Sequence, residues 1–259
     1  MDTHELLDLA IEAARRAGAL LLERFHAEAT GVETKMSSTD LVSDADRDTE
    51  RMLKDLIGSA RPDDGYLGEE GARAGSSTGI TWIVDPLDGT VNYLYRRPEW
   101  SVSIAAADPD GPLIGAILDP NRDELFTATR GEGAHLNGSR VRVSEQTDLA
   151  QALVGTGFSY EVDVRMFQAE VMTRVLRSVR DIRRPGSAAL DLCSVACGRY
   201  DGYYESHMWA WDRAAGELIA REAGAVVTDL PPPNSDGTDV GVIAANPDLH
   251  AKLAAIVVG

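Results

Sequence analysis

Apolar residues recur every three or four positions over the first sixty residues, a spacing that predicts two amphipathic helices. The first is expected over residues 3–27, with an apolar face made of Leu6, Leu9, Ala13, Ala17, Leu20 and Leu21. The second begins near Ser43, which stands in capping-box spacing with Asp46, and ends before Pro62. Between them, residues 35–40 are polar and predict a loop.

From residue 80 onward, short apolar runs replace this pattern and predict strands. They are expected at 80–84, 101–107, 113–118, 125–129 and 141–143, with a glycine-rich turn over 131–138. Further strands are expected at 153–156, 181–184, 202–205, 225–228 and 240–244. Helices are expected at 164–180, 187–198, 212–223 and 247–257, and a flexible loop at 231–237. Alternating helices and strands indicate a layered α/β fold.

Composition narrows the possible functions. The 259 residues are 44% hydrophobic, which is enough to bury a core. Asp and Glu total 42 against 25 Lys and Arg, so the net charge of −17 argues against nucleic acid as the primary ligand and against a polybasic membrane surface. No apolar stretch approaches the roughly 18–20 residues of a membrane span, and the N-terminus lacks the pattern of a signal peptide. We therefore expect a cytoplasmic protein.

The segment with the clearest chemistry is residues 82–90, Trp-Ile-Val-Asp-Pro-Leu-Asp-Gly-Thr. Pro86 keeps Asp85 extended at the end of a strand and helps the chain turn, so that Asp88 can come back beside Asp85. Two converging carboxylates suit Mg²⁺, and a helix beginning at Gly89 and Thr90 would offer N–H groups to a phosphate. The alternative is an ordinary turn with Asp88 as a helix cap, which contributes about 1 kcal/mol.

Three other acidic motifs accompany this segment. Glu69 lies in Gly-Glu-Glu-Gly, Asp46 in Ser-Asp-Ala-Asp, and Asp212 directly follows Trp211. Taken singly, the glutamate suits a solvated turn and the two aspartates suit helix caps. Their joint occurrence favours a shared site.

Together, these motifs resemble the inositol monophosphatase family of Mg²⁺-dependent, lithium-sensitive phosphatases. The resemblance covers nearly the whole chain in the family's order, at residues 68–70, 82–93, 131–138, 186–192, 195–198, 201–205, 211–216 and 222–225. It implies a layered α-β-α-β-α sandwich of the inositol monophosphatase and fructose-1,6-bisphosphatase type. It also implies a single domain over 1–259, with an α+β part over about 1–145 and an α/β part over about 146–259, and a homodimer.

The resemblance assigns roles to individual residues. The implied ligands of two to three Mg²⁺ ions are Glu69, Asp85, the carbonyl of Leu87, Asp88 and Asp212, with a weaker third ion near Lys35. The implied catalytic residues are Glu69 and the pair Asp46 and Thr90, which orients the attacking water. The implied substrate-binding residues are Asp88, Gly89, Thr90, Ser187, Ala188, Glu205 and Asp212. Inhibition by Li⁺ is expected.

The implied reaction is hydrolysis of a small sugar-alcohol phosphate by an activated water, without a covalent intermediate. Glu205 matches the carboxylate that binds a ring hydroxyl, and Val91 stands where relatives acting on histidinol phosphate or 3′-phosphoadenosine 5′-phosphate carry lysine. These two positions, together with the segment 186–191, favour inositol 1-phosphate, although fructose 1,6-bisphosphate and the two other esters stay open. Tyr93 and Tyr95 replace the phenylalanine and histidine of a family segment, which affects substrate shape or dimer contacts more than chemistry.

Two further interpretations belong to other classes. Haloacid-dehalogenase-type phosphatases carry D-x-D-x-T with a nucleophilic aspartate, but here the two acids, Asp85 and Asp88, are one residue further apart. Some relatives instead act as partners of the transcription or ribosome-assembly machinery. The full set of acids favours an enzyme, and a second, regulatory role stays open beside it.

Overall fold

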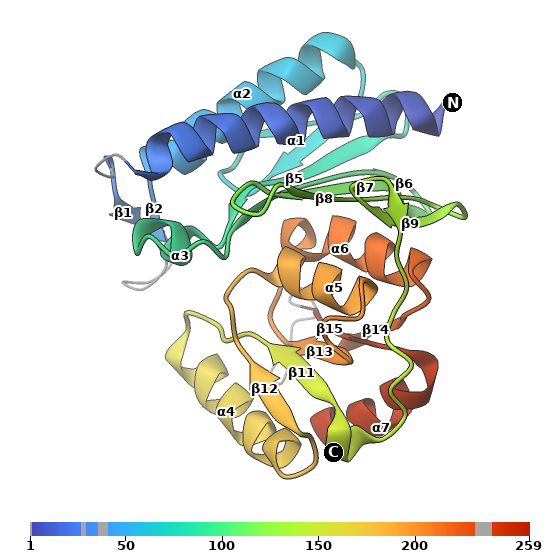
Figure 1. The fold of residues 1–259 in the computed structure, drawn as a ribbon. Helices are drawn as coiled ribbons and strands as arrows, with labels where there is room; N and C mark the ends of the chain where they lie inside the picture. The colour runs from blue at the N-terminus through green and yellow to red at the C-terminus, as the bar shows by residue number, and fades with distance from the viewer. Residues whose placement is uncertain (1, 27–29, 36–40, 231–239) are drawn as a thin grey trace.

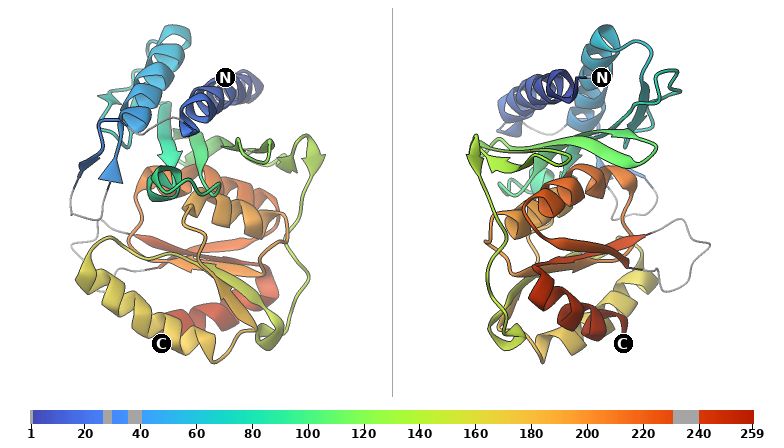
Figure 2. Two further views of the ribbon diagram at one scale, coloured as in Figure 1. Left: turned by 60° about the vertical axis from the view of Figure 1, so that its left-hand side comes forward. Right: turned by 90° about the vertical axis from the view of Figure 1, so that its right-hand side faces the viewer.

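Five layers of helices and sheets are stacked on one another (Figure 1). In this computed structural model, which describes residues 2–26, 30–35, 41–230 and 240–259, two helices cover the outer face of an eight-stranded sheet. Two more helices lie between that sheet and a five-stranded one, whose far face is covered by another two. The α-β-α-β-α order confirms the layered fold that the resemblance implies, and Figure 2 shows the same stacking from two other sides.

The helices lie in three of these layers. The outer pair is α1 (Thr3–Phe25) and α2 (Asp44–Ala60), the middle pair α5 (Ala188–Ala196) and α6 (Ala210–Glu222), and the far pair α4 (Val162–Leu176) and α7 (Pro247–Val258). The short α3 (Thr90–Leu94) follows the acidic segment, and η1 (Leu149–Gln151) is a single 3₁₀ turn. The predicted capping box of Ser43 and Asp46 does begin α2. No helix within the described ranges is both long and apolar enough to cross a membrane.

The first sheet is mostly antiparallel. Its strands, in spatial order, are β10 (Ser139–Arg140), β9 (Gly133–Leu136), β8 (Glu124–Thr129), β7 (Gly111–Asp119), β6 (Ser101–Asp108), β5 (Thr81–Asp88), β3 (Gly65–Gly68) and β4 (Arg73–Ala74). The exception to the antiparallel pattern is the parallel pair β3 and β5. A separate ribbon joins β1 (Glu33–Thr34) and β2 (Leu41–Val42).

The second sheet mixes parallel and antiparallel pairs. Its order is β12 (Asp181–Arg183), β11 (Leu153–Thr156), β13 (Gly202–Glu205), β15 (Gly241–Ala245) and β14 (Val226–Leu230). The first three strands are parallel and the last two pair antiparallel. The parallel edge follows from the crossover helices α4 and α5, which return the chain to the same end of the sheet.

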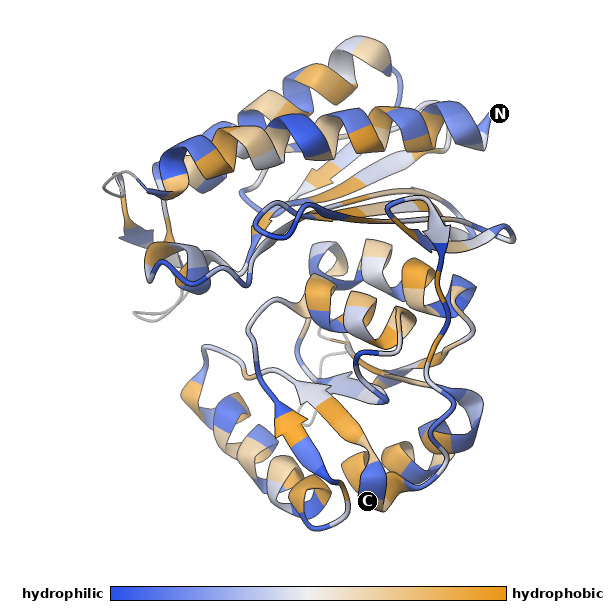
Figure 3. Ribbon diagram, in the orientation of Figure 1, coloured by the Kyte–Doolittle hydropathy of each residue, from blue (hydrophilic) through white to orange (hydrophobic). Residues whose placement is uncertain are grey.

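Apolar side chains fill the space between layers, and Figure 3 shows hydrophobic and hydrophilic residues alternating along the ribbons of the helices. Between the outer helices and the first sheet, Leu6 and Leu21 of α1 pack in one cluster with the fully buried Trp82 and Trp100. Burial of side chains this large contributes roughly 1.5–3 kcal/mol each. The indole N–H of Trp82 donates to Asp64 (3.0 Å), so its one polar atom is satisfied.

Three expectations were wrong in detail. Strand β3 was not predicted, the glycine-rich turn over 131–138 contains β9, and residues 141–143 form no strand within the described chain. The N–H of Val143 instead donates to Ala223 at the end of α6 (3.2 Å), because this segment runs from the first sheet to the lower layers. The predicted loops at 36–40 and 231–237 lie outside the described residues.

Candidate active site

The parallel pairing of β3 with β5 brings two of the predicted acids together. Gly68 pairs with Val84, so the next residue on each strand, Glu69 and Asp85, lies at the same edge of the sheet. The N–H of Glu69 donates to the carbonyl of Val84 (3.2 Å) and fixes this register. The two carboxylates come within hydrogen-bonding range of each other.

Asp88 is placed by a bulge and not by the turn that the sequence suggests. Strand β5 continues through Pro86 to Asp88, and its register against β6 shifts between Asp85 and Asp88. Proline lacks an N–H and is tolerated inside a sheet at such a bulge. The N–H of Leu87 donates to the Asp85 carboxylate (2.9 Å), which ties the bulged segment to the acid.

Helix α5 holds Asp88 from the other side. The carboxylate accepts hydrogen bonds from the Ser187 hydroxyl (2.5 Å) and from the N–H groups of Ala189 (2.9 Å) and Ala188 (3.3 Å). Ser187 is also the N-cap of α5. Ser187 and Ala188, which are predicted to contact the substrate, therefore also hold the Asp88 carboxylate in place.

Helix α6 contributes Asp212 through its first turn. In β6, Ser103 pairs with Asp85, and its hydroxyl lies 3.5 Å from the carbonyl of Trp211. Asp212 accepts a hydrogen bond from the N–H of Trp209 (2.6 Å) and closes a capping box. The cap interpretation of Asp212 is therefore correct, and the same carboxylate also lines the cavity.

Asp46 and Thr90 form a second unit beside these acids. The Thr90 hydroxyl lies 2.9 Å from one Asp46 oxygen and 3.1 Å from the carbonyl of Leu87. The other Asp46 oxygen accepts from the N–H and the hydroxyl of Ser43 (2.9 and 2.6 Å). Asp46 is fully buried, and burial raises the pKa of its carboxyl group. It reaches the cavity only through Thr90.

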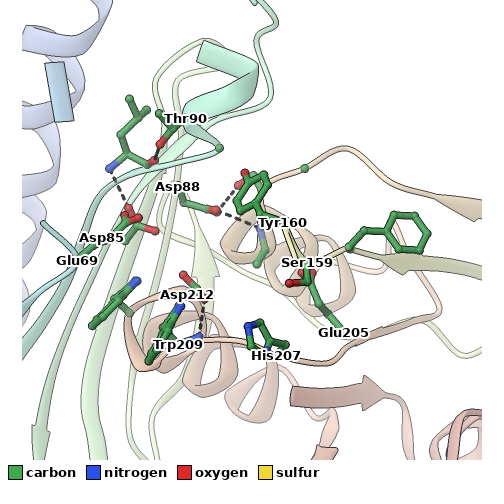
Figure 4. Close-up of a pocket in the computed structure, with 18 of the residues that line it drawn as sticks. Glu69, Asp85, Asp88, Thr90, Ser159, Tyr160, Glu205, His207, Trp209 and Asp212 are labelled. Carbon is green, nitrogen blue, oxygen red and sulfur yellow. Dashed lines mark hydrogen bonds between the residues drawn. The ribbon is translucent and has the colours of Figure 1, made fainter. Parts of the chain in front are cut away.

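A cavity of about 400 Å³ joins these elements (Figure 4). Of the predicted site residues, all of which lie in the described ranges, every one except Asp46 lines it. Figure 4 shows Glu69, Asp85, Asp88 and Asp212 on one side and Glu205 further along. The sequence motifs therefore meet at a single place, while their individual roles stay predictions.

Burial and, after it, mutual repulsion determine the electrostatics of this side. Burial and then the charges of Glu69 and Asp88 raise the pKa of Asp85 well above its ordinary value. Burial and the charge of Glu69 raise the pKa of Asp88 to about 6, against the opposing hydrogen bonds of α5. Burial and Glu69 also raise the pKa of Asp212. Such a cluster is stabilised by protons or by a cation.

The donor chemistry fits Mg²⁺, since hard carboxylate and carbonyl oxygens are the ligands that this ion prefers. Within the ranges that the structure describes, no three His, Cys, Asp or Glu side chains already converge in a coordinating arrangement. The Lys35 ammonium instead lies 2.8 Å from Glu69 and 2.7 Å from Glu70. Asp88 and Asp212 are each held by hydrogen-bond donors of their own. The residues that carry these oxygens nevertheless line one cavity.

Glu205 closes the far side of the cavity, at the end of β13. Burial raises the pKa of its carboxyl group to about 7, and the Tyr203 hydroxyl donates to it. Gly157 packs directly against this carboxylate, and a Cβ atom at that position would overlap its oxygens. The glycine therefore leaves room for Glu205 beside the cavity.

Several lining residues escaped the sequence analysis because they belong to no acidic motif. They are Arg73, Gly157, Phe158, Ser159, Tyr160, Glu161, Arg184, His207 and Trp209. Most come from the loops after β11 and β13, whose place in the fold a sequence pattern does not fix. The one available signal was the position of Trp209, two residues before Trp211 of the family segment 211–216.

Comparison with known proteins agrees with this geometry. The model of the inositol monophosphatase family matches residues 2–259. The inositol-1-monophosphatase SuhB of Mycobacterium tuberculosis is 44% identical over 262 residues, covering 96% of this chain and 90% of that protein. The Nus factor SuhB of Pasteurella multocida is 42% identical, covering 96% and 94%.

A solved structure gives the same result for the fold. The extragenic suppressor protein suhB from Bartonella henselae superposes with a TM-score of 0.90 at 37% identity, covering 98% of both chains. Sequence and fold thus agree over the full described length. The chain belongs to the inositol monophosphatase family.

Proposed function

We propose that this chain is a Mg²⁺-dependent hydrolase of phosphate monoesters, with inositol 1-phosphate as its preferred substrate. The observation that carries the proposal is the Thr90–Asp46 pair beside the carboxylates of Asp85 and Asp88. A hydroxyl held by a buried acid next to a cation-binding cluster is suited to aiming a water at phosphorus.

The metal ligands are those that the family resemblance implies, and their residues all line the cavity. Glu69, Asp85 and the Leu87 carbonyl would hold one ion, and Asp85, Asp88 and Asp212 a second. When bound, Mg²⁺ would offset the carboxylate repulsion and make the site attractive to a phosphate that a net charge of −17 repels. A third ion would lie near Glu69 and compete with Lys35 for its carboxylate.

Thr90 and Asp46 would position the nucleophile. With its proton donated to Asp46, the Thr90 hydroxyl oxygen is left to accept a hydrogen bond from a water in the cavity. That water would attack phosphorus in line with the ester oxygen, and no covalent intermediate is needed. Phosphate-monoester hydrolysis is among the slowest uncatalysed reactions, so a large part of the acceleration must come from such positioning and from charge neutralisation.

The far side of the cavity would select the alcohol. Glu205 would bind a ring hydroxyl, while the backbone near Ser187 and Ala188 would line the sugar-alcohol pocket. A panel of phosphate-release assays with and without Mg²⁺ should rank inositol 1-phosphate above fructose 1,6-bisphosphate, histidinol phosphate and 3′-phosphoadenosine 5′-phosphate. A higher kcat/KM for one of the other three esters would make that ester the preferred substrate and leave the proposed reaction unchanged.

The substitution Asp88→Asn should abolish hydrolysis while leaving the fold intact. Its amide keeps the side-chain volume and one oxygen for the N–H of Ala189, but it loses the ligand charge. Changes around metal ligands cost about 10–100-fold, so we expect a loss above about 100-fold for a ligand itself. The measurement is phosphate release alongside circular dichroism and thermal unfolding.

Asp55→Asn is the matched control, because Asp55 is an exposed aspartate on α2 outside the cavity. It should keep wild-type turnover. Near-wild-type turnover by a folded Asp88→Asn variant would overturn the assignment.

A regulatory role is a second candidate, because relatives such as the Pasteurella multocida protein carry the name Nus factor SuhB. The two functions separate in one experiment. If Asp88→Asn restores the growth phenotype of a deletion strain while lacking phosphatase activity, the binding of a partner and not hydrolysis accounts for that phenotype. If it fails to complement while Asp55→Asn succeeds, hydrolysis is the required function.

A further inference from the structure

Two loops form the far side of the cavity, beside Glu205, and both begin at neighbouring strands. Thr156 at the end of β11 pairs in parallel with Tyr204 of β13, so the chain leaves both strands at the same edge of the second sheet. Residues 157–161 form the first loop and residues 206–209 the second, and both loops contribute side chains to the cavity (Figure 4). Ligands commonly bind outside the carboxyl ends of such strands, where loops decide how far apart the binding groups lie.

A single buried amide connects these two loops. Gln168 lies on α4 and is only 5% exposed. Its side-chain oxygen accepts a hydrogen bond from the N–H of Ser159 in the first loop (2.7 Å). Its side-chain nitrogen donates to the carbonyl (2.9 Å) and lies 3.1 Å from the hydroxyl of Ser206 in the second loop. Only this orientation of the amide satisfies both loops, because a flipped amide would direct N–H groups at the N–H of Ser159.

Packing alone does not explain an amide at this position. The buried side chains of α4 are Gln168, Val171 and Val175, at the spacing of an inward-facing apolar stripe. An apolar residue at position 168 would extend the stripe, whereas a buried amide costs desolvation energy unless it is hydrogen-bonded. What the amide adds to the helix is therefore the connection between the two loops.

The same connection constrains Glu205. Gly157 of the first loop packs against one side of its carboxylate, and the Tyr203 hydroxyl donates to it. If the two loops moved apart, Gly157 would withdraw and the Glu205 side chain would gain freedom to rotate. Gln168 does not line the cavity, so it can act on a substrate only through these neighbours.

Resting on the proposed phosphatase function, we propose that Gln168 is a positioning residue that sets the preference of the site for a hydroxyl-bearing alcohol. It holds the two loops at a fixed separation, so that Glu205 stays where a ring hydroxyl of the substrate can reach it. Asp88 and Thr90 belong to β5 and α3, on the first sheet's side of the cavity. Loss of the amide therefore weakens binding of the alcohol and leaves the attack of water on phosphorus unchanged.

The test replaces Gln168 by methionine, which has a similar unbranched shape and no amide. Phosphate release is measured for inositol 1-phosphate and for 4-nitrophenyl phosphate, whose alcohol carries no further hydroxyl group. Gln168→Met should raise KM for the inositol ester about tenfold with kcat nearly unchanged, as expected when one hydrogen bond shared by the ground and transition states is lost. The kcat/KM for 4-nitrophenyl phosphate should stay close to the wild-type value.

Two further variants accompany this one. Gln168→Glu keeps the oxygen for the N–H of Ser159 and removes the donors to Ser206, so the kcat/KM ratio of the two esters should change in the same direction. Gln151→Met is the matched control, because Gln151 is an exposed glutamine on η1 outside the cavity. It should leave both esters unaffected.

Hydrogen exchange followed by mass spectrometry gives a measurement that needs no activity. Peptides over 157–161 and 206–209 should exchange faster in Gln168→Met than in the wild type, while peptides of the first sheet should not. Equal exchange of the loops in a folded variant, an equal loss of kcat/KM for both esters, or a fall in kcat with constant KM would each overturn the inference and leave hydrolysis intact. If the wild type hydrolyses neither ester with Mg²⁺, the proposed function itself fails, and the exchange comparison still decides whether Gln168 connects the loops.

Discussion

Thr90 links the buried acid Asp46 to the cavity. Its hydroxyl has one proton, and Asp46 accepts it at 2.9 Å while Ser43 occupies the other Asp46 oxygen. The orientation of the Thr90 lone pairs is therefore set by a residue that does not itself line the cavity. A hydroxyl group at position 90 matters for this arrangement, and the methyl group does not.

Thr90→Ala should lower kcat by roughly 10²–10⁴-fold, the range for loss of a positioned proton-transfer group, with little change in KM. Thr90→Ser keeps the hydroxyl and should stay within about tenfold of the wild type. The measurement is steady-state phosphate release at saturating Mg²⁺. Equal activity of the two variants would show that the hydroxyl does not position the water.

The raised pKa of the Glu205 carboxyl group should make the stability of the folded protein depend on pH. Burial raises the pKa of this carboxyl group to about 7 in the folded chain, so the folded state holds a proton that the unfolded state releases between about pH 4.5 and 7. The folded protein therefore loses stability as pH rises through this window, because it must bury the charge of the ionised Glu205 carboxylate.

Glu205→Gln removes this titration while keeping an oxygen for the Tyr203 hydroxyl. Relative to the wild type, the variant should therefore gain thermal stability as pH rises from 5 to 8. Thermal unfolding in EDTA at several pH values measures the difference. A constant difference across this range would contradict the burial of a titrating carboxylate.

At the scale of elements, periodic segments were predictable and pairing was not. Helices α1, α2 and α6 and strand β5 follow from apolar spacing and caps that lie within each segment. Strand β3 is four residues long with a glycine at each end, so it carries no pattern of its own. It forms because β5 and β4 flank it, and its register with β5 is what brings Glu69 to Asp85.

The candidate site shows the same division. The motif of Asp85 and Asp88 was visible locally, but the sequence suggested a turn where the chain forms a β-bulge. That Asp46 would lie behind Thr90 came from family resemblance, because 44 residues separate them and no local rule connects them. Of the aromatic residues that line the cavity, Trp211 lies in the family segment 211–216, whereas Phe158, Tyr160 and Trp209 had neither a local pattern nor a family motif to predict them. Loops joined only in space contribute these three, so they appeared with the structure.

At the scale of the whole molecule, the net charge of −17 and the buried acids both destabilise the folded state through repulsion between negative charges. Asp85, Asp88 and Asp212 have carboxyl pKa values raised by burial and by their neighbours, so the folded chain holds unfavourable charge at neutral pH. A ligand that binds only the folded state stabilises it by mass action. Mg²⁺ is expected to do this more strongly than general screening by salt.

Addition of Mg²⁺ to EDTA-treated protein should raise the unfolding midpoint by about 5–10 °C at about 100 times the dissociation constant. NaCl at the same ionic strength should give a much smaller shift, since it only screens the charges. Differential scanning calorimetry at pH 7.5 makes the comparison. Identical shifts for the two salts would argue against a specific ion site, and Asp88→Asn should reduce the Mg²⁺ effect alone.

The cavity lies between the two sheets, so its acids come from distant parts of the chain and are synthesised at different times. Glu69, Asp85 and Asp88 leave the ribosome early, whereas Asp212 follows Asp88 by roughly 120 residues. At about 5–20 residues per second, a nascent chain carries an incomplete acidic cluster for roughly 6–25 s. During that interval the first sheet can form without the repulsion of the last acid and without a complete ion site. Under the proposed function, this unfinished protein would lack one ligand of the second ion, and hydrolytic competence would arrive only with the final third of the chain.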